Sequence, residues 1–263
     1  MKILQRPALP HVDAEAALAE ARRLIARKIE QPARRAFLTR SLTMGGLSLL
    51  TGCRISDNDS VEAALGAISR FNDKAQGLLF DPTRLAPTYP ASMITRPFPF
   101  NAYYSEDEVR VVDEASYRLD VTGLVADRRR WTLAQLRAMA QHDQITRHIC
   151  VEGWSAIGRW GGVRFADFLQ RVGADISAKY VGFKCADDYH TSIDMPTALH
   201  PQTLLALTYD GQPLPPKYGF PMKLRMPTKL GYKNPKHIQA IYVTNVHPGG
   251  YWEDQGYNWF GGS

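Results

Sequence analysis

Three cysteines, Cys53, Cys150 and Cys185, are the residues of this chain best suited to metal or redox chemistry. None stands in a C-x-x-C pair and no two histidines are four residues apart, so the spacing argues against a zinc site. His148 and Cys150 could supply two ligands of a copper or iron centre, but no third ligand stands at a convincing spacing. A disulfide between Cys150 and Cys185 is compatible with an exported protein. Considered alone, Cys150 is best explained as a small buried residue or a half-cystine.

Three sequence blocks change this interpretation. Cys150 begins the run Cys-Val-Glu-Gly-Trp-Ser, and Trp160 follows ten residues beyond the cysteine. A second block, residues 214–227, combines prolines with basic residues, and a third covers residues 231–238. Their order and approximate spacing, over about residues 95–247, resemble the sulfite-oxidase superfamily of molybdopterin-dependent oxidoreductases. The resemblance is closest to its periplasmic branch, which contains the catalytic subunit of protein-methionine-sulfoxide reductase.

The resemblance implies that Cys150 is the thiolate ligand of molybdenum in a molybdenum–molybdopterin cofactor. A soft, anionic sulfur suits a high-valent metal that two dithiolene sulfurs of the pterin already bind. Such a centre supports oxygen-atom transfer coupled to two electrons, while the protein supplies binding, orientation and electrostatics. Tyr189 matches the tyrosine that points at the substrate oxygen in sulfite oxidases, although a surface turn residue is an equal alternative. We therefore expect Cys150 and Tyr189 to be the catalytic residues.

The resemblance also implies a set of cofactor-binding residues. Relatives bind the phosphate tail with a polar residue and an arginine at the positions of Tyr218 and Lys223, and they place a threonine at the position of Cys185. A lysine neutralises phosphate as a point charge without the bidentate geometry of arginine, and a thiol is a weak donor. The complete expected set is Asn101, Tyr104, Ser105, Cys150, Cys185, Tyr218, Lys223, Asn234, Pro235 and Lys236.

Other polar and aromatic residues near these blocks have simpler explanations. Trp154 and Trp160 are expected in the core, because aromatic side chains bury a large area. His148 is expected to be a satisfied strand histidine, and Glu152 either orients the neighbouring backbone or relays a proton. The glycine- and aromatic-rich residues 249–263 are expected to fold back on the core, with closure over the cofactor or contact with a partner as alternatives.

Short elements must position these residues. Alternating apolar residues predict strands, and apolar residues at helical spacing predict short helices. The expected strands cover residues 117–122, 148–151, 180–185, 204–209, 222–226 and 238–246, and the expected helices cover residues 61–71, 131–136 and 165–172. This mixture predicts an α+β fold of the sulfite-oxidase type, with mixed sheets and short helices. Only 17 residues follow Val246, so we expect no additional dimerisation domain and a monomer.

The N-terminal residues 1–53 have the features of an export leader. Arg34 and Arg35 precede an apolar stretch over residues 42–50, which resembles a twin-arginine signal. Leu-Thr-Gly-Cys at its end resembles a lipobox, with Cys53 as a candidate lipid anchor. A solvated basic pair and an ordinary cysteine in an uncleaved signal are the alternatives. We therefore expect a periplasmic or cell-envelope protein, with a leader at 1–53, an extended proline-rich arm at 54–100 and a molybdopterin-binding oxidoreductase domain at 101–263.

Charge and missing motifs exclude several function classes. The net charge is +6, but residues 1–52 contribute +5 of it, so the remaining 211 residues offer little basis for nucleic-acid binding. No P-loop, G-x-G-x-x-G or haem-binding C-x-x-C-H motif is present. Electrons must therefore come from or go to a separate carrier, and we expect a membrane haem b protein or a cytochrome.

Three functions remain open at this point. The first is reduction of a small-molecule or sulfoxide-like substrate with electrons from the membrane partner. The second is sulfite-type oxidation, which is disfavoured because the positions just after Cys150 lack the arginine expected to hold an anion. The third is a cofactor-free lipoprotein that uses the same fold as a binding module, which the departures at Tyr218, Lys223 and Cys185 favour.

Overall fold

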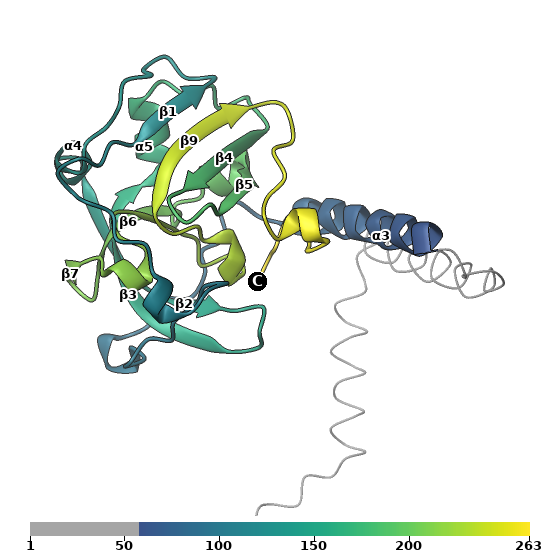
Figure 1. Cartoon of the computed structure of the whole chain (residues 1–263), viewed down its shortest axis with the longest axis horizontal. Helices are drawn as coiled ribbons and strands as arrows, with labels where there is room; N and C mark the ends of the chain where they lie inside the picture. The colour runs from purple at the N-terminus through teal and green to yellow at the C-terminus, as the bar shows by residue number, and fades with distance from the viewer. Residues whose placement is uncertain (1–57) are drawn as a thin grey trace, which may run out of the picture. The chain divides into compact units, whose positions relative to one another are not determined.

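Two β-sheets form the body of the protein in the computed structural model, which describes residues 58–263 (Figure 1). The four-stranded sheet has the order β1–β9–β4–β5, with β1 at Asp120–Gly123, β9 at Ile238–Thr244, β4 at Tyr180–Cys185 and β5 at His190–Asp194. The other sheet has the order β2–β3–β6–β7 with β8 also paired to β6: β2 is Gln141–Ile149, β3 Ser155–Arg164, β6 Leu204–Tyr209, β7 Gln212–Pro213 and β8 Lys223–Arg225. Among the described strands only β1 and β9 pair in parallel, so the four-stranded sheet is mixed, as expected, and the five-stranded sheet is antiparallel.

Four α-helices accompany the sheets in the described chain: α3 (Asn58–Leu79), α4 (Leu133–Arg137), α5 (Phe165–Arg171) and α6 (Met195–Ala198). Helix α4 has a side-chain N-cap, because the backbone N–H of Gln135 donates to Thr132 Oγ1 at 3.2 Å. In α5, Phe165, Phe168 and Leu169 are completely buried. The predicted combination of β-sheets with short helices is therefore confirmed, and α3 is the one long helix among the described residues.

The main hydrophobic core joins the two sheets. Val121, Phe183 and Ile241 contribute from the four-stranded sheet, and Val163 and Leu205 contribute from the five-stranded sheet. A second, mostly aromatic cluster surrounds the completely buried Trp160. Burial on this scale provides the rigid base on which loops at the strand ends can carry functional side chains.

The sequence-based elements agree with the structure unevenly. Strands 180–185 and 204–209 are confirmed with the same bounds. The predicted strand 148–151 is wrong in its limits, because β2 starts at Gln141 and ends at Ile149. The predicted helix 61–71 lies within the longer α3, and β3 and β5 were not predicted. The sequence gives little sign of β3 because the strand is rich in glycine, which has a low strand propensity. A Cβ at Gly162 would come within 2.0 Å of the carbonyl oxygen of Leu205, so the close approach of the two strands requires glycine at this position.

The proline-rich residues 80–100 run in extended form against the five-stranded sheet. Thr88 makes a β-bridge with Thr146 in β2, and the N–H of Thr95 donates to the carbonyl of Ile157 in β3 at 2.9 Å. Prolines suit such a segment, since they restrict φ without contributing a donor. These contacts bring Asn101 to the end of β2, where Cys150 lies.

Candidate active site

Cys150 occupies the tight turn between β2 and β3. Its N–H donates to the carbonyl of Trp154 at 2.9 Å, and its own carbonyl accepts from Gly153 at 3.2 Å. Gly153 has φ of 90°, a left-handed conformation that favours glycine. The turn holds the cysteine rigidly, and its side chain is buried.

The Cys150 sulfur lies between a donor and an acceptor. Asn101 Nδ2 donates to the sulfur at 3.2 Å, and the thiol donates to Glu152 Oε2 over 3.6 Å. The Glu152 carboxylate also accepts from the indole N–H of Trp154 at 2.9 Å, which fixes its direction. Burial raises the pKa of the Cys150 thiol, the backbone N–H groups of Glu152 and Val151 lower it, and the Glu152 carboxylate raises it. The protein alone therefore favours the neutral thiol, whereas a bound metal would favour the thiolate.

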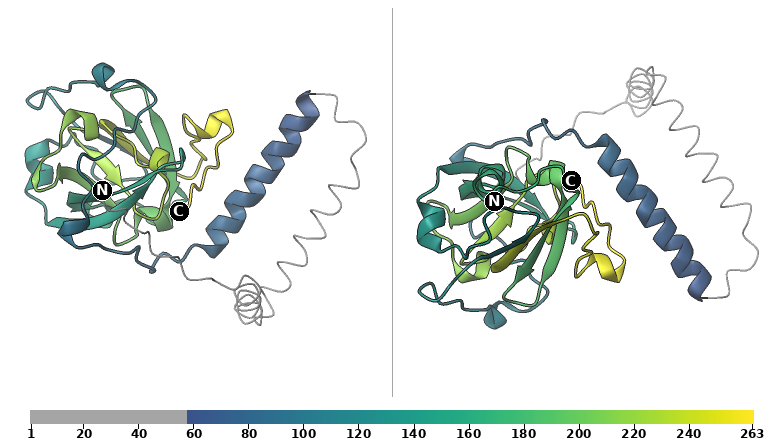
Figure 2. Two further views of the ribbon diagram at one scale, coloured as in Figure 1. Left: turned by 90° about the horizontal axis from the view of Figure 1, so that it is seen from below. Right: turned by 90° about the horizontal axis from the view of Figure 1, so that it is seen from above.

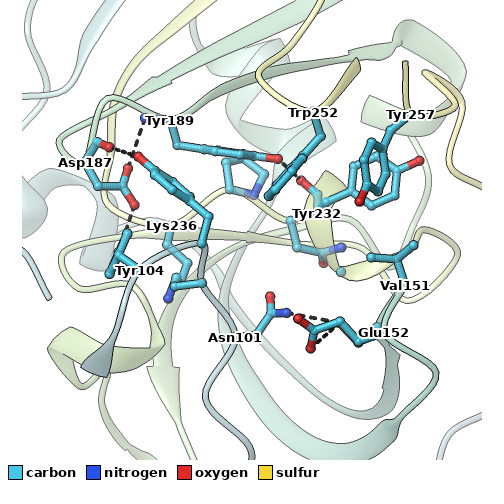
Figure 3. A pocket seen from close by; sticks show the side chains of 16 residues that line it. Asn101, Tyr104, Val151, Glu152, Asp187, Tyr189, Tyr232, Lys236, Trp252 and Tyr257 are labelled. Atoms are coloured by element: carbon cyan, nitrogen blue, oxygen red, sulfur yellow. Dashed lines mark hydrogen bonds between the residues drawn. The ribbon is translucent and has the colours of Figure 1, made fainter. Parts of the chain in front are cut away.

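Cys150 lines a pocket of about 130 Å³, which Figure 3 shows from close by. Asn101 and Glu152 lie on one side, and the aromatic rings of Tyr189, Trp252 and Tyr257 lie on the other. Five parts of the chain contribute: the end of the arm, the β2–β3 turn, the β4–β5 turn, residues 231–236 and the C-terminal segment. The pocket thus combines a soft sulfur with a largely aromatic wall.

Two phenolic groups of the pocket lining, those of Tyr104 and Tyr189, are engaged by hydrogen bonds. Tyr189 is buried and its Oη donates to the carbonyl of Tyr232 at 2.6 Å. Tyr104 Oη donates to Asp187 Oδ2 at 2.9 Å, and Tyr103 stacks on Tyr251 with ring centroids 4.7 Å apart. Burial raises the pKa values of Tyr104 and Tyr189 far above the ordinary tyrosine value. These rings therefore stay neutral at physiological pH.

A cluster of buried basic side chains adjoins the pocket. Lys223 and Arg225 alternate along β8 and so point to the same side, and Lys236 lines the pocket itself. Their exposed fractions are 3%, 0% and 8%, and within residues 58–263 none of them forms an ion pair. We call Lys223, Arg225, Lys236 and the buried His148 the cation cluster. Burial lowers the pKa of His148, and the three cations lower it further.

Polar atoms in this cluster lack partners. Both ring nitrogens of His148 and Nε of Arg225 are buried without a hydrogen bond, so the expectation of a satisfied His148 is wrong. The Arg225 guanidinium is otherwise fixed, because Nη2 donates to the carbonyl of Arg147 at 2.6 Å and Nη1 to Asn234 Oδ1 at 3.2 Å. A Cβ on Gly231 would come within 2.8 Å of His148 Nε2. Buried positive charge is costly without an anion, so the cluster fits the phosphate of a molybdopterin tail, and the Cys150 sulfur fits its metal.

The structure brings most of the expected site residues together. Those that line the pocket are Asn101, Tyr104, Cys150, Tyr189, Asn234, Pro235 and Lys236. Lys223 belongs to the cation cluster instead. The Asn234 side chain also holds the neighbouring loop, since its Oδ1 accepts from the N–H of Met226 at 2.7 Å.

Three expected residues lie away from the pocket lining. Ser105 caps a short 3-10 helix, and its hydroxyl donates to Glu108 at 2.8 Å. Tyr218 donates to the carbonyl of Phe98 at 2.8 Å within the aromatic cluster around Trp160. Cys185 is buried in the main core; it and Cys150 are both free thiols, so they form no disulfide. Cys53 and the rest of the leader lie outside the described residues.

Sequence reasoning missed three residues that the structure places at or beside the site. Arg225 escaped notice although the spacing Lys-x-Arg within an expected strand indicates two cations on one face. For Trp252 and Tyr257 the sequence indicated only that the segment 249–263 could close over the cofactor. Nothing in the local sequence of that segment specifies which of its aromatic rings reaches the pocket.

Comparison with known proteins identifies the family. The model of the oxidoreductase molybdopterin-binding domain matches residues 106–252, which include Cys150, Tyr189 and the whole cation cluster. The chain belongs to this family. It is therefore a molybdopterin oxidoreductase, and the expected superfamily, fold class and enzyme class are confirmed.

Individual relatives of this molybdopterin oxidoreductase differ in how much they share. A protein of Azospira oryzae named "Putative protein-methionine-sulfoxide reductase subunit YedZ1" is 74% identical over 239 residues, which cover 91% of each chain. An uncharacterised oxidoreductase of Bacillus subtilis, YuiH, is 28% identical over 64% of this chain and 85% of its own. The protein-methionine-sulfoxide reductase catalytic subunit MsrP of Xanthomonas axonopodis is 34% identical over 134 residues, so this chain spans 42% of that relative.

Proposed function

We propose that this chain is an exported molybdenum–molybdopterin enzyme that reduces a sulfoxide-like substrate with electrons from a membrane haem protein. The observation that carries the proposal is the Cys150 sulfur, fixed at the inner end of an aromatic pocket next to the cation cluster. The names of the relatives YedZ1 and MsrP supply the substrate class. The proposed reaction consumes a sulfoxide, two electrons and two protons, and it yields a thioether and water.

When bound, the molybdenum cofactor would supply a two-electron redox centre for oxygen-atom transfer. The residues of this chain hold and orient it: Cys150 would ligate the metal, and the cation cluster would neutralise the phosphate tail. Asn101 directs an N–H at the sulfur and so stabilises a thiolate. The walls of the pocket exclude bulk water from the reacting sulfur of the substrate.

The electrostatics of the pocket favour a neutral substrate. Glu152 and Asp187 line it as carboxylates, and Lys236 is the only basic side chain among its lining residues. A neutral sulfoxide suits aromatic walls, because sulfur makes favourable contacts with ring edges. The dianion of sulfite would meet the two carboxylates, so sulfite oxidation is the weaker candidate.

Tyr189 stays a predicted catalytic residue. Its hydroxyl donates to the Tyr232 carbonyl, so contact with a substrate oxygen requires that hydrogen bond to be exchanged. A Tyr189→Phe variant keeps the aromatic wall and removes only the hydroxyl. If Tyr189 contacts the substrate oxygen, kcat falls while the molybdenum content stays constant, whereas an unchanged kcat contradicts the assignment.

Metal analysis of holoenzyme from a host that makes molybdopterin tests the cofactor. We expect near-stoichiometric molybdenum in the wild type and in the control Cys53→Ser. In Cys150→Ser we expect the metal to be lost or to lack thiolate-like spectral features. Folded, metal-free wild type would contradict the enzyme proposal and favour the cofactor-free binding module.

The direction of catalysis needs a separate measurement on the loaded enzyme. A methionine sulfoxide derivative with a reduced viologen donor is compared with sulfite and an oxidised acceptor. Faster turnover of the sulfoxide supports the proposed reductase. Turnover of sulfite alone would instead establish the oxidase.

The proposed location rests on the leader. No helix among the described residues is long and apolar enough to cross a bilayer. The twin-arginine pair at Arg34 and Arg35 and the lipobox ending at Cys53 support export and lipid anchoring. Mass spectrometry of the mature N-terminus checks this, because a lipidated Cys53 as first residue is expected and an intact leader would contradict it.

A further inference from the structure

Helix α3 meets the body of the protein through its polar side. Asp73 Oδ1 accepts from the N–H of Phe260 at 2.7 Å, and Gln76 Oε1 accepts from the N–H of Gly262 at 3.0 Å. Figure 2 shows the C-terminal end of the chain close to the C-terminal end of α3 in both views. Amphipathic helices of soluble proteins ordinarily bury their apolar side, so this arrangement is reversed.

The opposite side of α3 carries exposed apolar side chains. Ile68, Phe71 and Leu78 lie on the side of α3 turned away from Asp73 and Gln76, and they are 56%, 40% and 82% exposed. Leu79 lies at the edge of this side, and Leu85 lies six residues beyond the end of α3, with exposures of 71% and 59%. We call these residues the α3 patch: Ile68, Phe71, Leu78, Leu79 and Leu85. Exposed apolar side chains gathered in this way mark an interaction surface.

Basic residues border the α3 patch. Arg70 and Lys74 precede Leu78 at four-residue spacing, so they lie along one edge of the apolar stripe. Arg84 and Arg147 line the groove that Leu79 and Leu85 also line. Among the ion pairs of the described chain none includes these four basic residues.

The acidic charge of this helix is kept away from the patch where its side chains are described. Asp73 points to the C-terminal segment and accepts its hydrogen bond there. The patch is therefore bordered by four basic side chains, and Asp81 is the one acidic residue that lines the same groove. Such a surface matches the boundary between the acyl chains and the anionic headgroups of a bilayer.

The preceding chain gives a second reason to choose a bilayer. Helix α3 begins at Asn58, five residues after the lipobox cysteine Cys53 and eight after the apolar stretch 42–50. Five residues span at most about 18 Å. An anchor at either place would hold α3 near the membrane surface, where its effective concentration is high.

We propose that the α3 patch binds the surface of an anionic bilayer, with the helix axis parallel to the membrane plane. The leucines and Phe71 enter the headgroup–acyl boundary, and the four bordering cations contact lipid phosphates. This assignment explains why α3 turns its polar side to the protein. It adds a membrane-contact surface to the enzyme and does not depend on the reaction at Cys150.

Vesicle binding tests the proposal in the full chain carrying Cys53→Ser, which removes lipidation. The patch variant Leu78→Gln/Leu79→Gln/Leu85→Gln is compared with the control Val111→Gln/Ile176→Gln/Val246→Gln, whose three positions are 85%, 61% and 76% exposed elsewhere. Sedimentation with vesicles of phosphatidylethanolamine and phosphatidylglycerol should show at least about a tenfold weaker binding for the patch variant only. Equal binding of the two variants would overturn the proposal.

A local probe separates α3 from any binding by residues 42–50. In the same Cys53→Ser background, a polarity-sensitive dye is attached through Leu78→Cys or, as control, Val111→Cys; the two native cysteines that remain are buried. Anionic vesicles should shift the emission to the blue at position 78 and leave it unchanged at position 111. The bilayer assignment would be overturned if the emission at position 78 did not shift, or if the shift required a membrane protein in the vesicle. It would also be overturned if the chain formed a dimer that the patch variant abolishes.

Discussion

Two groups of buried cations differ in their partners. Lys233 forms an ion pair with Glu253, and that carboxylate also accepts from Thr191 Oγ1 at 2.6 Å. Lys229 lies 3.9 Å from Asp194 and donates to the carbonyl of Phe260 at 2.9 Å. The cation cluster near Cys150 has no such carboxylates within the described chain.

This difference in carboxylate partners distinguishes cations that stabilise the fold from cations that are suited to bind a ligand. Lys229 and Lys233 fasten the C-terminal segment, which carries Trp252 and Tyr257 into the pocket. The cation cluster instead has no carboxylate partner within the described chain, which destabilises the protein without its cofactor. The paired cations therefore hold the segment that carries two aromatic rings of the site, and the cation cluster offers its charge to a phosphate.

The largest expected change in stability follows the loss of the ion pair between Lys233 and Glu253. Replacing Lys233 by Met leaves the Glu253 carboxylate buried without its partner, which should lower the free energy of unfolding by about 3–5 kcal/mol. Urea unfolding of the cofactor-free protein measures it. The double variant Lys233→Met/Glu253→Gln should recover part of the loss, and a loss below about 1 kcal/mol in the single variant would mean that the ion pair does not hold the segment.

Removing a charge from the cation cluster should raise the free energy of unfolding instead of lowering it. Burial lowers the pKa of Lys223 well below its ordinary value, and Lys236 and Arg225 add to the effect. Lys223→Met removes a costly buried charge, so the cofactor-free protein should gain about 1–3 kcal/mol.

Inorganic phosphate distinguishes this gain from a simple packing effect. It should raise the melting temperature of the wild-type apoprotein more than chloride at equal ionic strength does, and Lys223→Met should lose that difference. Destabilisation by Lys223→Met, or an undiminished response to phosphate, would contradict a phosphate-binding role for the cluster.

Lys229 provides a test through pH. Burial lowers its pKa to about 7 in the folded protein, whereas an unfolded lysine keeps its proton to about pH 10.4. Between these values the unfolded state binds more protons, so stability increases with pH. The wild type should gain about 1.5 kcal/mol between about pH 7 and 8.5 that Lys229→Met does not gain. Identical pH dependence of unfolding in the two proteins would show that Lys229 is charged throughout.

The comparison also shows what the sequence could predict. Contiguous blocks around Cys150 and residues 231–238 indicated the family and the cysteine at the centre of the site, because their residue types are specific. The pairing of Lys233 with Glu253 and the unpaired state of Lys223 depend on side chains brought together across the fold. Neither follows from spacing along the chain.

The secondary-structure predictions succeeded where the local sequence determines the element and failed where tertiary packing does. Strand 180–185 has strong apolar alternation and was predicted with its bounds, whereas β3 is glycine-rich and was missed. Its glycines reflect close packing against β6, a tertiary requirement that local propensity does not contain. The exposed apolar side of α3 likewise appears only once the helix is seen to dock through Asp73 and Gln76.

Tyr218 gives the smallest and sharpest test, because family resemblance and structure assign it differently. The resemblance places it at the phosphate tail, whereas its hydroxyl donates to the Phe98 carbonyl and its ring packs in the aromatic cluster. Tyr218→Phe keeps the ring and removes one buried hydrogen bond, so it should cost about 1 kcal/mol of stability.

If Tyr218 belongs with the structural residues, the same variant should keep the full stabilisation by inorganic phosphate that Lys223→Met loses. A loss of that response in Tyr218→Phe would return the residue to the phosphate site. The cation cluster would then be one part of a wider anion-binding surface that reaches the arm at Phe98.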